Sequence, residues 1–235
     1  MVNKLKKILI LGGSSDIGLS IVENLLTNKS NIIYLHYNSS NLKNKKKSKQ
    51  IKYLKSNFLK EDVNQVINKF DANYDVIVNL TGYLKTQSFE NINYNSIIES
   101  ISINSLIPNL IIKKSLSHMK KQRWGRIINT SSIGTKFGGS KDTYSYSISK
   151  YLNEFIPSYI KNLVKYNILY NVVRIGVINT KIHKKINNKN LKKRMSLIPI
   201  KRIGQPKEVS NFINFLISEQ NTYLSSQVID LAGGE

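Results

Sequence analysis

The feature that most constrains the fold is an alternation between short apolar segments and longer amphipathic segments along the whole chain. The apolar segments are continuous, which is typical of strands that are buried on both faces of a parallel sheet. The amphipathic segments between them have the pattern of helices that cover such a sheet. We expect strands at 6–11, 31–37, 51–55, 74–80, 125–131, 167–175 and 226–231, and helices at 17–28, 61–70, 91–121, 144–165 and 206–218.

This order of elements predicts an α/β fold with a doubly wound, Rossmann-type parallel sheet. The 235 residues suffice for one large domain or two small ones. Because no internal repeat and no Pro/Gly-rich linker divides the chain, we expect a single domain over 1–235. Two basic stretches interrupt the pattern. We expect a solvated loop or helix at 39–49, and a helical substrate lid at 181–205, over the carboxyl ends of the strands.

Composition excludes several classes of site. The chain has no cysteine, so disulfides and thiolate metal sites are impossible. Its three histidines show no ligand spacing, and we expect no metal. No stretch approaches the roughly 18 apolar residues of a membrane span, and the apolar run at 8–11 is too short for a signal peptide. We therefore expect a cytoplasmic protein.

The formal net charge of +22 has two interpretations. A strongly basic chain can bind nucleic acid or an anionic membrane. However, the 36 cationic residues include only five arginines, the residue best suited to phosphate, and the lysines are spread widely. We favour a lysine-rich composition without a specific nucleic-acid or membrane partner. An anionic substrate or cofactor agrees with either interpretation.

A glycine-rich turn, LGGSSDIG at 11–18, connects the first expected strand to the first expected helix. Glycines let the backbone approach a pyrophosphate, and a helix N-terminus offers N–H donors and the positive end of its dipole. The position after the first strand supports a dinucleotide site, although the spacing is not that of GxGxxG. The residues predicted to bind the cofactor here are Gly12, Ser14, Ser15, Asp16, Ile17 and Gly18.

A Tyr-x-x-x-Lys pair, Tyr146 and Lys150, occurs once in the chain. On a helix the two side chains lie on one face, a turn apart. A free phenol has a pKa near 10, and a neighbouring ammonium is expected to lower it toward neutrality, which suits general acid–base catalysis. Tyr144 has Ile148 four residues on, so we expect it to line the pocket or to pack.

Several motifs together carry a family resemblance over essentially the whole chain. NLTG (79–82), GRIINTSS (125–132), YSISK (146–150) and RIGVINT (174–180) follow the glycine turn in order, and a C-terminal block begins at PIKRIG. The chain resembles the short-chain dehydrogenase/reductase family, and within it the 3-oxoacyl-(acyl-carrier-protein) reductases. It departs from the family pattern at Leu11 (Thr), Asp16 (Gly) and Ile175 (Pro); Asp16 could cap the following helix but puts a carboxylate near phosphate.

The resemblance implies the roles of the site residues. Asn104, Ser132, Tyr146 and Lys150 match the catalytic tetrad: the serine polarises a carbonyl, Lys150 also binds the nicotinamide ribose, and Asn104 anchors a proton-relay water. Ser131 is the alternative serine. At the end of the second strand, 36–38 has no carboxylate, which favours NADP over NAD, although Asn38 or Ser39 could bind a plain ribose. The further residues implied for cofactor binding are Asn38, Asn57, Asn79, Gly82, Tyr146, Lys150 and Thr180.

The substrate is less constrained than the chemistry. The resemblance favours reduction of a 3-oxoacyl group. The insertion at 135–145 departs from that subgroup and leaves open a sugar-like or other polar carbonyl. A cofactor-binding regulatory protein without turnover is a further alternative. The resemblance also implies a homodimer or homotetramer through the helices at 91–121 and 146–165.

The carrier that would present a 3-oxoacyl group is itself a predicted partner. An acidic carrier protein would be attracted by Lys120, Lys121 and Arg123 and by the basic stretch of the expected lid. The same basic residues are also explained by a solvated helix end in a lysine-rich chain, and this alternative stays open.

Overall fold

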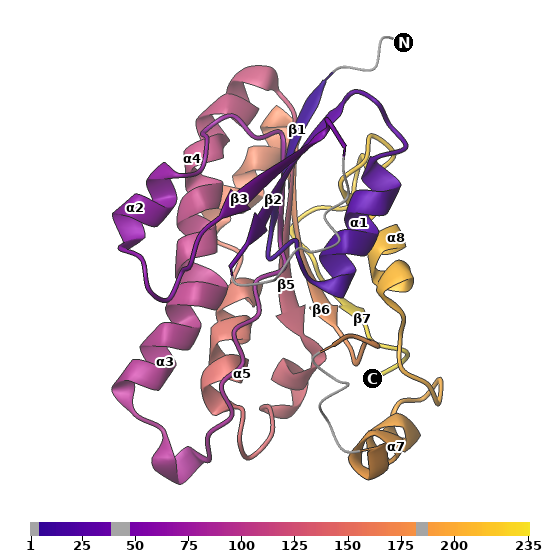
Figure 1. Cartoon of the computed structure of the whole chain (residues 1–235). Helices are drawn as coiled ribbons and strands as arrows, with labels where there is room; N and C mark the ends of the chain where they lie inside the picture. The colour runs from indigo at the N-terminus through magenta and orange to yellow at the C-terminus, as the bar shows by residue number, and fades with distance from the viewer. Residues whose placement is uncertain (1–4, 39–47, 182–187) are drawn as a thin grey trace.

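The computed structural model describes residues 5–38, 48–181 and 188–235, and within them seven parallel strands form one sheet (Figure 1). The strand order is β3-β2-β1-β4-β5-β6-β7, so the chain winds outward in both directions from β1 and β4. This confirms the predicted doubly wound α/β fold. The strands are β1 (Lys6–Leu11), β2 (Asn31–Tyr37), β3 (Ile51–Lys55), β4 (Val76–Asn79), β5 (Gly125–Ser132), β6 (Ile168–Ile175) and β7 (Val228–Leu231).

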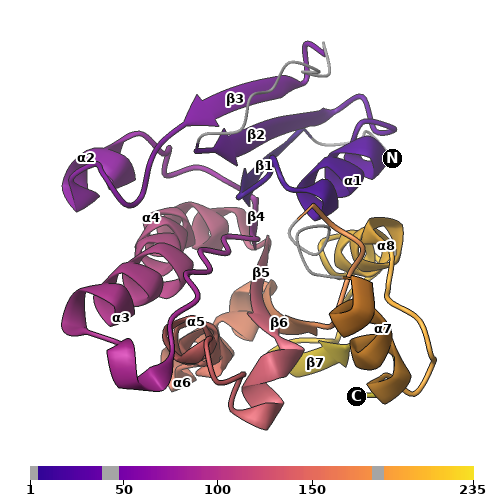
Figure 2. The same ribbon diagram turned by 60° about the horizontal axis from the view of Figure 1, so that its bottom comes forward.

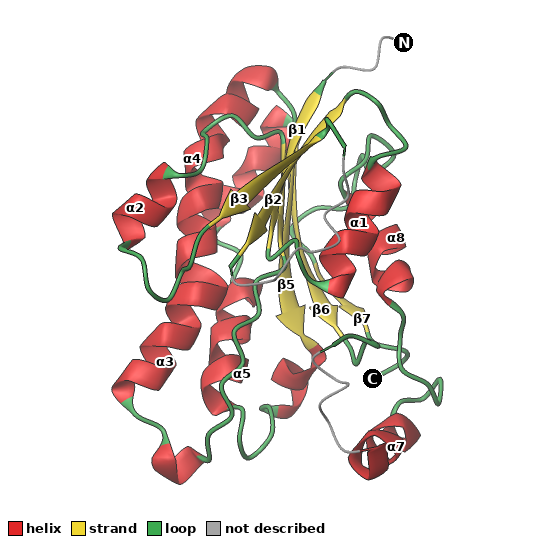
Figure 3. Ribbon diagram, in the orientation of Figure 1, coloured by secondary structure: helices red, strands yellow, loops and turns green. Residues whose placement is uncertain are grey.

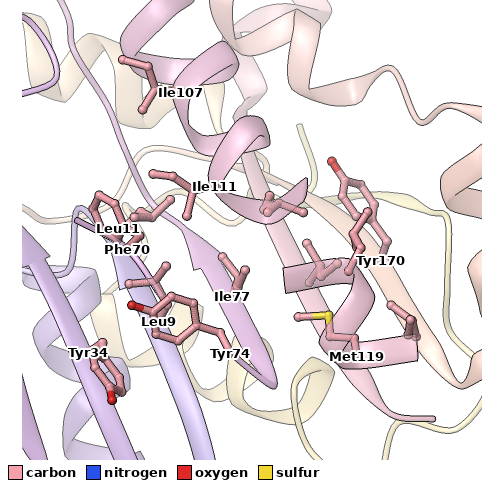
Figure 4. Close-up of a cluster of buried hydrophobic side chains, with 14 of the residues drawn as sticks. Leu9, Leu11, Tyr34, Phe70, Tyr74, Ile77, Ile107, Ile111, Met119 and Tyr170 are labelled. Carbon is pink, nitrogen blue, oxygen red and sulfur yellow. The ribbon is translucent and has the colours of Figure 1, made fainter. Parts of the chain in front are cut away.

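Helices cover both faces of the sheet (Figures 2 and 3). Successive strand residues point to opposite faces, and β1 shows this directly: Leu9 belongs to one buried cluster and Ile8 to the other. Figure 4 shows the first cluster, in which Ile107 and Ile111 lie over the sheet. This face carries α2 (Val63–Asn68), α3 (Tyr94–Ile101), α4 (Ile107–Gln122) and α5 (Tyr144–Tyr151), and the other carries α1 (Asp16–Leu25) and α8 (Pro206–Leu216).

The long helix expected at 91–121 is interrupted. A π-helical turn, η2 (Ser102–Leu106), separates α3 from α4, and Pro108 lies in the first turn of α4. The wider π-turn re-aims side chains and is frequent at functional sites. Here it holds Asn104 fully buried.

The single helix expected at 144–165 is wrong. Helix α5 ends at Tyr151, a 3₁₀ turn η4 (Leu152–Glu154) follows, and the chain resumes as α6 (Ser158–Lys161) and η5 (Asn162–Tyr166). The cause is Pro157, which has no N–H for a helical hydrogen bond and excludes the helical conformation from the residue before it.

The carboxyl ends of the strands lie beside the basic helix α7 (Asn188–Leu197) and the C-terminus, as Figures 1 and 2 show. Helix α7 agrees with the helix expected in the stretch 181–205, but 182–187 lies outside the described residues. Most of the basic stretch at 39–49 also lies outside them. The crevice beside β1 and β4, where the winding direction reverses, is the usual ligand position in such sheets.

Candidate active site

The glycine turn after β1 is held in a single backbone conformation. Gly12 has a φ of 67°, and a side chain at Gly18 would meet the carbonyl oxygen of Gly13 at 2.4 Å. The hydroxyl of Ser15 accepts a hydrogen bond from the Gly18 amide at 3.1 Å and so caps α1. Ser15 is therefore the N-cap, and the expectation that Asp16 fills that position is wrong. The arrangement presents a helix N-terminus to the crevice.

His36, at the end of β2, supports this turn and was not among the residues predicted from sequence. Its Nδ1 accepts a hydrogen bond from the Gly12 amide at 3.1 Å, and its Nε2 lies 3.0 Å from the carbonyl oxygen of Ser56. The ring stacks on Phe58 with centroids 4.4 Å apart. Burial lowers the pKa of His36 to about 4, so the ring is neutral at pH 7. A lone histidine gives no spacing signal by which sequence could have found it.

The carboxylate of Asp16 is paired. It accepts a hydrogen bond from the Lys181 backbone amide at 2.8 Å, and the Lys181 Nζ lies 3.9 Å away. Lys181 directly follows Thr180, one of the predicted cofactor residues. Asp16, which stands where the family pattern has glycine, thus connects the start of α1 to the segment that leads toward α7.

Tyr146 and Lys150 lie on the same face of α5, as their spacing predicts, and both line the same cavity. The Lys150 Nζ donates to the carbonyl oxygens of Thr81 at 2.6 Å and Thr130 at 3.2 Å. The phenol of Tyr146 is hydrogen-bonded to Ser132. One group of side chains therefore brings together the ends of β4 and β5 with helix α5.

The pKa of Tyr146 differs from the sequence expectation. Burial raises it to about 12, and the hydrogen bond with Ser132 offsets only part of this rise. Burial also lowers the pKa of Lys150 to about 7. The prediction that Lys150 lowers the pKa of Tyr146 is thus wrong for the protein alone. Burial removes water from both side chains, which disfavours the Tyr146 phenolate and the Lys150 ammonium.

The two candidate serines have different partners. Ser131 donates to Glu154 at 2.6 Å, and Glu154 also forms an ion pair with Arg174 at 2.6 Å. Ser132 instead meets Tyr146 and accepts a weak hydrogen bond from Gly134 at 3.3 Å. Both serines line the cavity, but only Ser132 is hydrogen-bonded to the phenol.

Asn104 and Asn79 are buried behind the cavity wall. The Asn104 side chain accepts from the Tyr83 amide at 2.7 Å and donates to Ser149 at 2.9 Å. Asn79 donates to Asn129 at 2.8 Å and accepts from the Thr81 amide at 3.1 Å. Their side chains therefore position backbone around the cavity.

A single cavity of about 1390 Å³ joins the glycine turn to Ser132, Tyr146 and Lys150. This exceeds the roughly 300–1,000 Å³ of ordinary small-ligand pockets and leaves room for a dinucleotide beside a substrate. Among the described residues, Gly18, Asn79 and Asn104 are not part of its lining. The predicted residues that line it are Gly12, Ser14, Ser15, Asp16, Ile17, Asn38, Asn57, Gly82, Ser132, Tyr146, Lys150 and Thr180.

The sequence predicted a lid at 181–205 and an insertion at 135–145 near the substrate, but it singled out no individual residue at this end of the cavity. Phe137, Arg194, Leu197 and Glu235 line it, and Arg194 forms an ion pair with Glu235. These residues come from segments that have no common motif. Tyr144 does not line the cavity; its ring packs edge-on against Phe89 with centroids 5.1 Å apart, which is the packing alternative.

Comparisons with known proteins identify the family to which this chain belongs. A family model described as enoyl-(acyl carrier protein) reductase matches residues 14–235. The 3-oxoacyl-[acyl-carrier-protein] reductase of Aquifex aeolicus is 31% identical, covering 96% of this chain and 95% of that protein. The chain belongs to the short-chain dehydrogenase/reductase family. It is accordingly an NAD(P)-dependent oxidoreductase of that family.

Solved structures of short-chain dehydrogenases share the fold. A family protein from Francisella tularensis superposes with a TM-score of 0.82 at 25% identity, covering 98% of both chains. A 3-oxoacyl (acyl-carrier-protein) reductase from Agrobacterium tumefaciens, with NADP bound, superposes with a TM-score of 0.82 at 18% identity, covering 99% of this chain and 95% of that one.

The described part of this short-chain dehydrogenase has neither a metal-binding cluster nor a membrane-spanning helix. No cluster of histidine and acidic side chains in it could hold a metal ion. No helix in the same ranges is long and apolar enough to cross a membrane.

Proposed function

We propose that this short-chain dehydrogenase reduces a ketone to an alcohol with NADP(H), or catalyses the reverse reaction, through Ser132, Tyr146, Lys150 and Asn104. The observation that carries the proposal is the hydrogen bond between Ser132 and Tyr146, beside Lys150, in the cavity that the glycine turn also lines. A 3-oxoacyl group is the first candidate substrate, since the relative in Aquifex aeolicus reduces it by name.

The chain's own residues account for binding and proton delivery. When bound, the reduced cofactor supplies the hydride. The Ser132 hydroxyl holds the carbonyl oxygen and stabilises the negative charge that develops there. Because the pKa of Tyr146 is about 12, its phenol is protonated at neutral pH and can donate that proton to the alkoxide. Lys150, with a pKa of about 7, can then return a proton to the phenolate.

The residues at the adenosine end of the cavity support NADP over NAD. Asn38 follows β2 and carries no carboxylate that would repel a 2′-phosphate, and Lys60 lines the same end. The Asn57 side chain accepts from the Leu59 amide at 3.0 Å and shapes the adenine side. The Agrobacterium tumefaciens reductase of the same fold has NADP bound.

A polar carbonyl substrate is the second candidate. Arg194 and Glu235 form their ion pair at the cavity, and the Glu235 Oε2 is buried without a hydrogen-bond partner among the described residues. A buried carboxylate oxygen of this kind favours a substrate that carries a hydroxyl or another donor. Helix α7, which carries Arg194, would act as the lid over such a substrate.

A substrate panel tests these proposals. Purified protein is assayed with NADPH and with NADH against 3-oxoacyl thioesters, on carrier protein and on a small-molecule mimic, and against hydroxylated ketones. We expect faster oxidation of NADPH than of NADH with at least one ketone. The Tyr146→Phe variant should lose about 10² to 10⁴ in kcat, as expected for removal of a general acid. Unchanged reduction by this variant would refute the catalytic role, and no turnover of any ketone would favour a regulatory protein.

We also propose that two copies pair through an exposed apolar face on α4 to α6. Lys120 donates to the Tyr159 hydroxyl at 2.6 Å, so α4 and α6 are neighbours there. The face consists of Leu106, Leu110, Tyr151, Leu152, Phe155 and Tyr159, each more than a third exposed. A concentration of exposed large apolar side chains is typical of an interaction site. The cytoplasmic location and the lack of nucleic-acid and membrane partners stay predictions.

A further inference from the structure

Asn153, in the 3₁₀ turn after α5, sits at the centre of the polar network behind the active site. Its side chain is 1% exposed. The amide nitrogen donates to the carbonyl oxygen of Asn104 at 3.0 Å and to that of Thr130 at 3.2 Å. Asn153 therefore connects the π-turn to the end of β5.

The same carbonyl oxygen of Thr130 also accepts from the Lys150 Nζ, at 3.2 Å. Since two donors share one acceptor atom, the Asn153 amide lies next to the Lys150 ammonium. This places Asn153 beside the group that is proposed to return a proton to Tyr146.

The backbone oxygen of Asn104 is fully engaged. It accepts from Asn153 at 3.0 Å and from the Asn79 side chain at 3.4 Å. A carbonyl oxygen has two lone pairs, so no good acceptor position is left on Asn104 for the relay water that the family resemblance implies. The Asn153 Oδ1, in contrast, is buried without a hydrogen-bond partner among the described residues. Buried acceptors are normally satisfied, often by water.

We propose that Asn153 is a positioning residue of the proton path, and that its Oδ1 holds the water which supplies protons to Lys150. This inference rests on the proposed reductase function. In reduction Tyr146 gives one proton to the alkoxide, the Lys150 ammonium returns one to the phenolate, and the water at Asn153 returns one to Lys150. One solvent proton is thus consumed per turnover, and no further reactant is needed.

Paired substitutions separate this role from a structural one. Asn153→Leu keeps the volume but removes both the donor and the acceptor. Asn153→Ala also removes them, but it leaves space in which water can reach Asn104 O and Lys150. The matched controls are Asn171→Leu and Asn171→Ala, since Asn171 is an equally buried asparagine on β6 that bonds to Leu224 and Gln227 away from the cavity.

The measurements are the single-turnover reduction rate, its pH profile and the melting temperature. We expect Asn153→Leu to slow reduction at least tenfold. The reduction rate of Asn153→Ala should stay within about threefold of the wild-type rate, although its melting temperature should be no higher than that of the leucine variant. The Asn171 variants should lower the melting temperature without a change in the pH profile. Reduction rates that simply follow the melting temperatures would overturn the proposal.

A second readout does not require turnover. The pH dependence of Lys150 acetylation, mapped by mass spectrometry, reports the pKa of Lys150 in each variant. We expect a lower pKa in Asn153→Leu, where the ammonium loses a polar neighbour, and a pKa near the wild-type value in Asn153→Ala. Asn153→Asp, which keeps the shape, should raise it. An unaltered Lys150 pKa in the leucine and aspartate variants would refute the role of Asn153, whereas an inactive wild type with these shifts would refute only the proposed reaction.

Discussion

The Asp16 carboxylate accepts a hydrogen bond from the Lys181 backbone amide at 2.8 Å, which joins the glycine-turn end of the cavity to the segment leading toward α7. Asp16 has a 25% exposed side chain at the first turn of α1. It therefore stabilises the helix N-terminus and the Lys181 segment, but it adds negative charge where a pyrophosphate would bind.

Removing that charge should strengthen cofactor binding. For Asp16→Asn we expect the Kd for NADPH to fall about threefold, with a larger effect at low salt because screening is weaker there. The measurement is fluorescence titration of NADPH at two salt concentrations. Glu23→Gln, at the other end of α1, is the control and should change little. A higher Kd in Asp16→Asn would show that the contact with Lys181 matters more than the repulsion.

Substitution of the two adjacent serines should affect kcat very differently. Ser132→Ala removes the hydroxyl that meets Tyr146 and should lower kcat by about 10² or more. Ser131→Ala removes a hydrogen bond to Glu154 and should cost about 1 kcal/mol of stability while kcat stays within threefold. Steady-state kinetics and thermal melting check both variants. The opposite ranking of the two kcat values would make Ser131 the catalytic serine.

His36 should make the protein less stable in mild acid. Its pKa falls from 6.5 to about 4 on folding, so below pH 6.5 the unfolded chain binds a proton that the folded chain excludes. The folded state therefore loses stability as the pH falls from 6.5 to 4, by about 3 kcal/mol in total. Urea unfolding across this range should show a shallower loss for His36→Gln than for the wild type. Parallel pH curves would contradict the burial of a neutral ring.

The apolar face on α4 to α6 should control assembly. Phe155 is 74% exposed, and we expect Phe155→Asp to shift the protein to a smaller species in sedimentation velocity, since a charge would be buried at the interface. Phe215→Asp on α8 is the matched control, because Phe215 is also exposed but lies away from this face. Equal sedimentation of both variants and the wild type would exclude this face as the interface.

The positions of the strands along the chain could be predicted because their cause is local. A continuous apolar run bounded by polar turns is sufficient to identify a buried parallel strand, and β1, β2 and β3 have the expected bounds. The pairing of Tyr146 with Lys150 is equally local, since four residues separate them on one helix. Pro157 could have indicated the end of the helix, but the helical pattern on both sides of it favoured one continuous helix.

The sequence by itself therefore determined the sheet, the glycine turn and the residue types of the active site. Only the tertiary structure decided that His36 supports Gly12, that Lys181 pairs with Asp16, and that Asn153 and Lys150 share the Thr130 carbonyl. It also decided that burial, rather than the neighbouring ammonium, dominates the pKa of Tyr146. The physical reason is that these contacts and the desolvation arise where residues far apart in the chain meet, and no periodicity or spacing records such meetings.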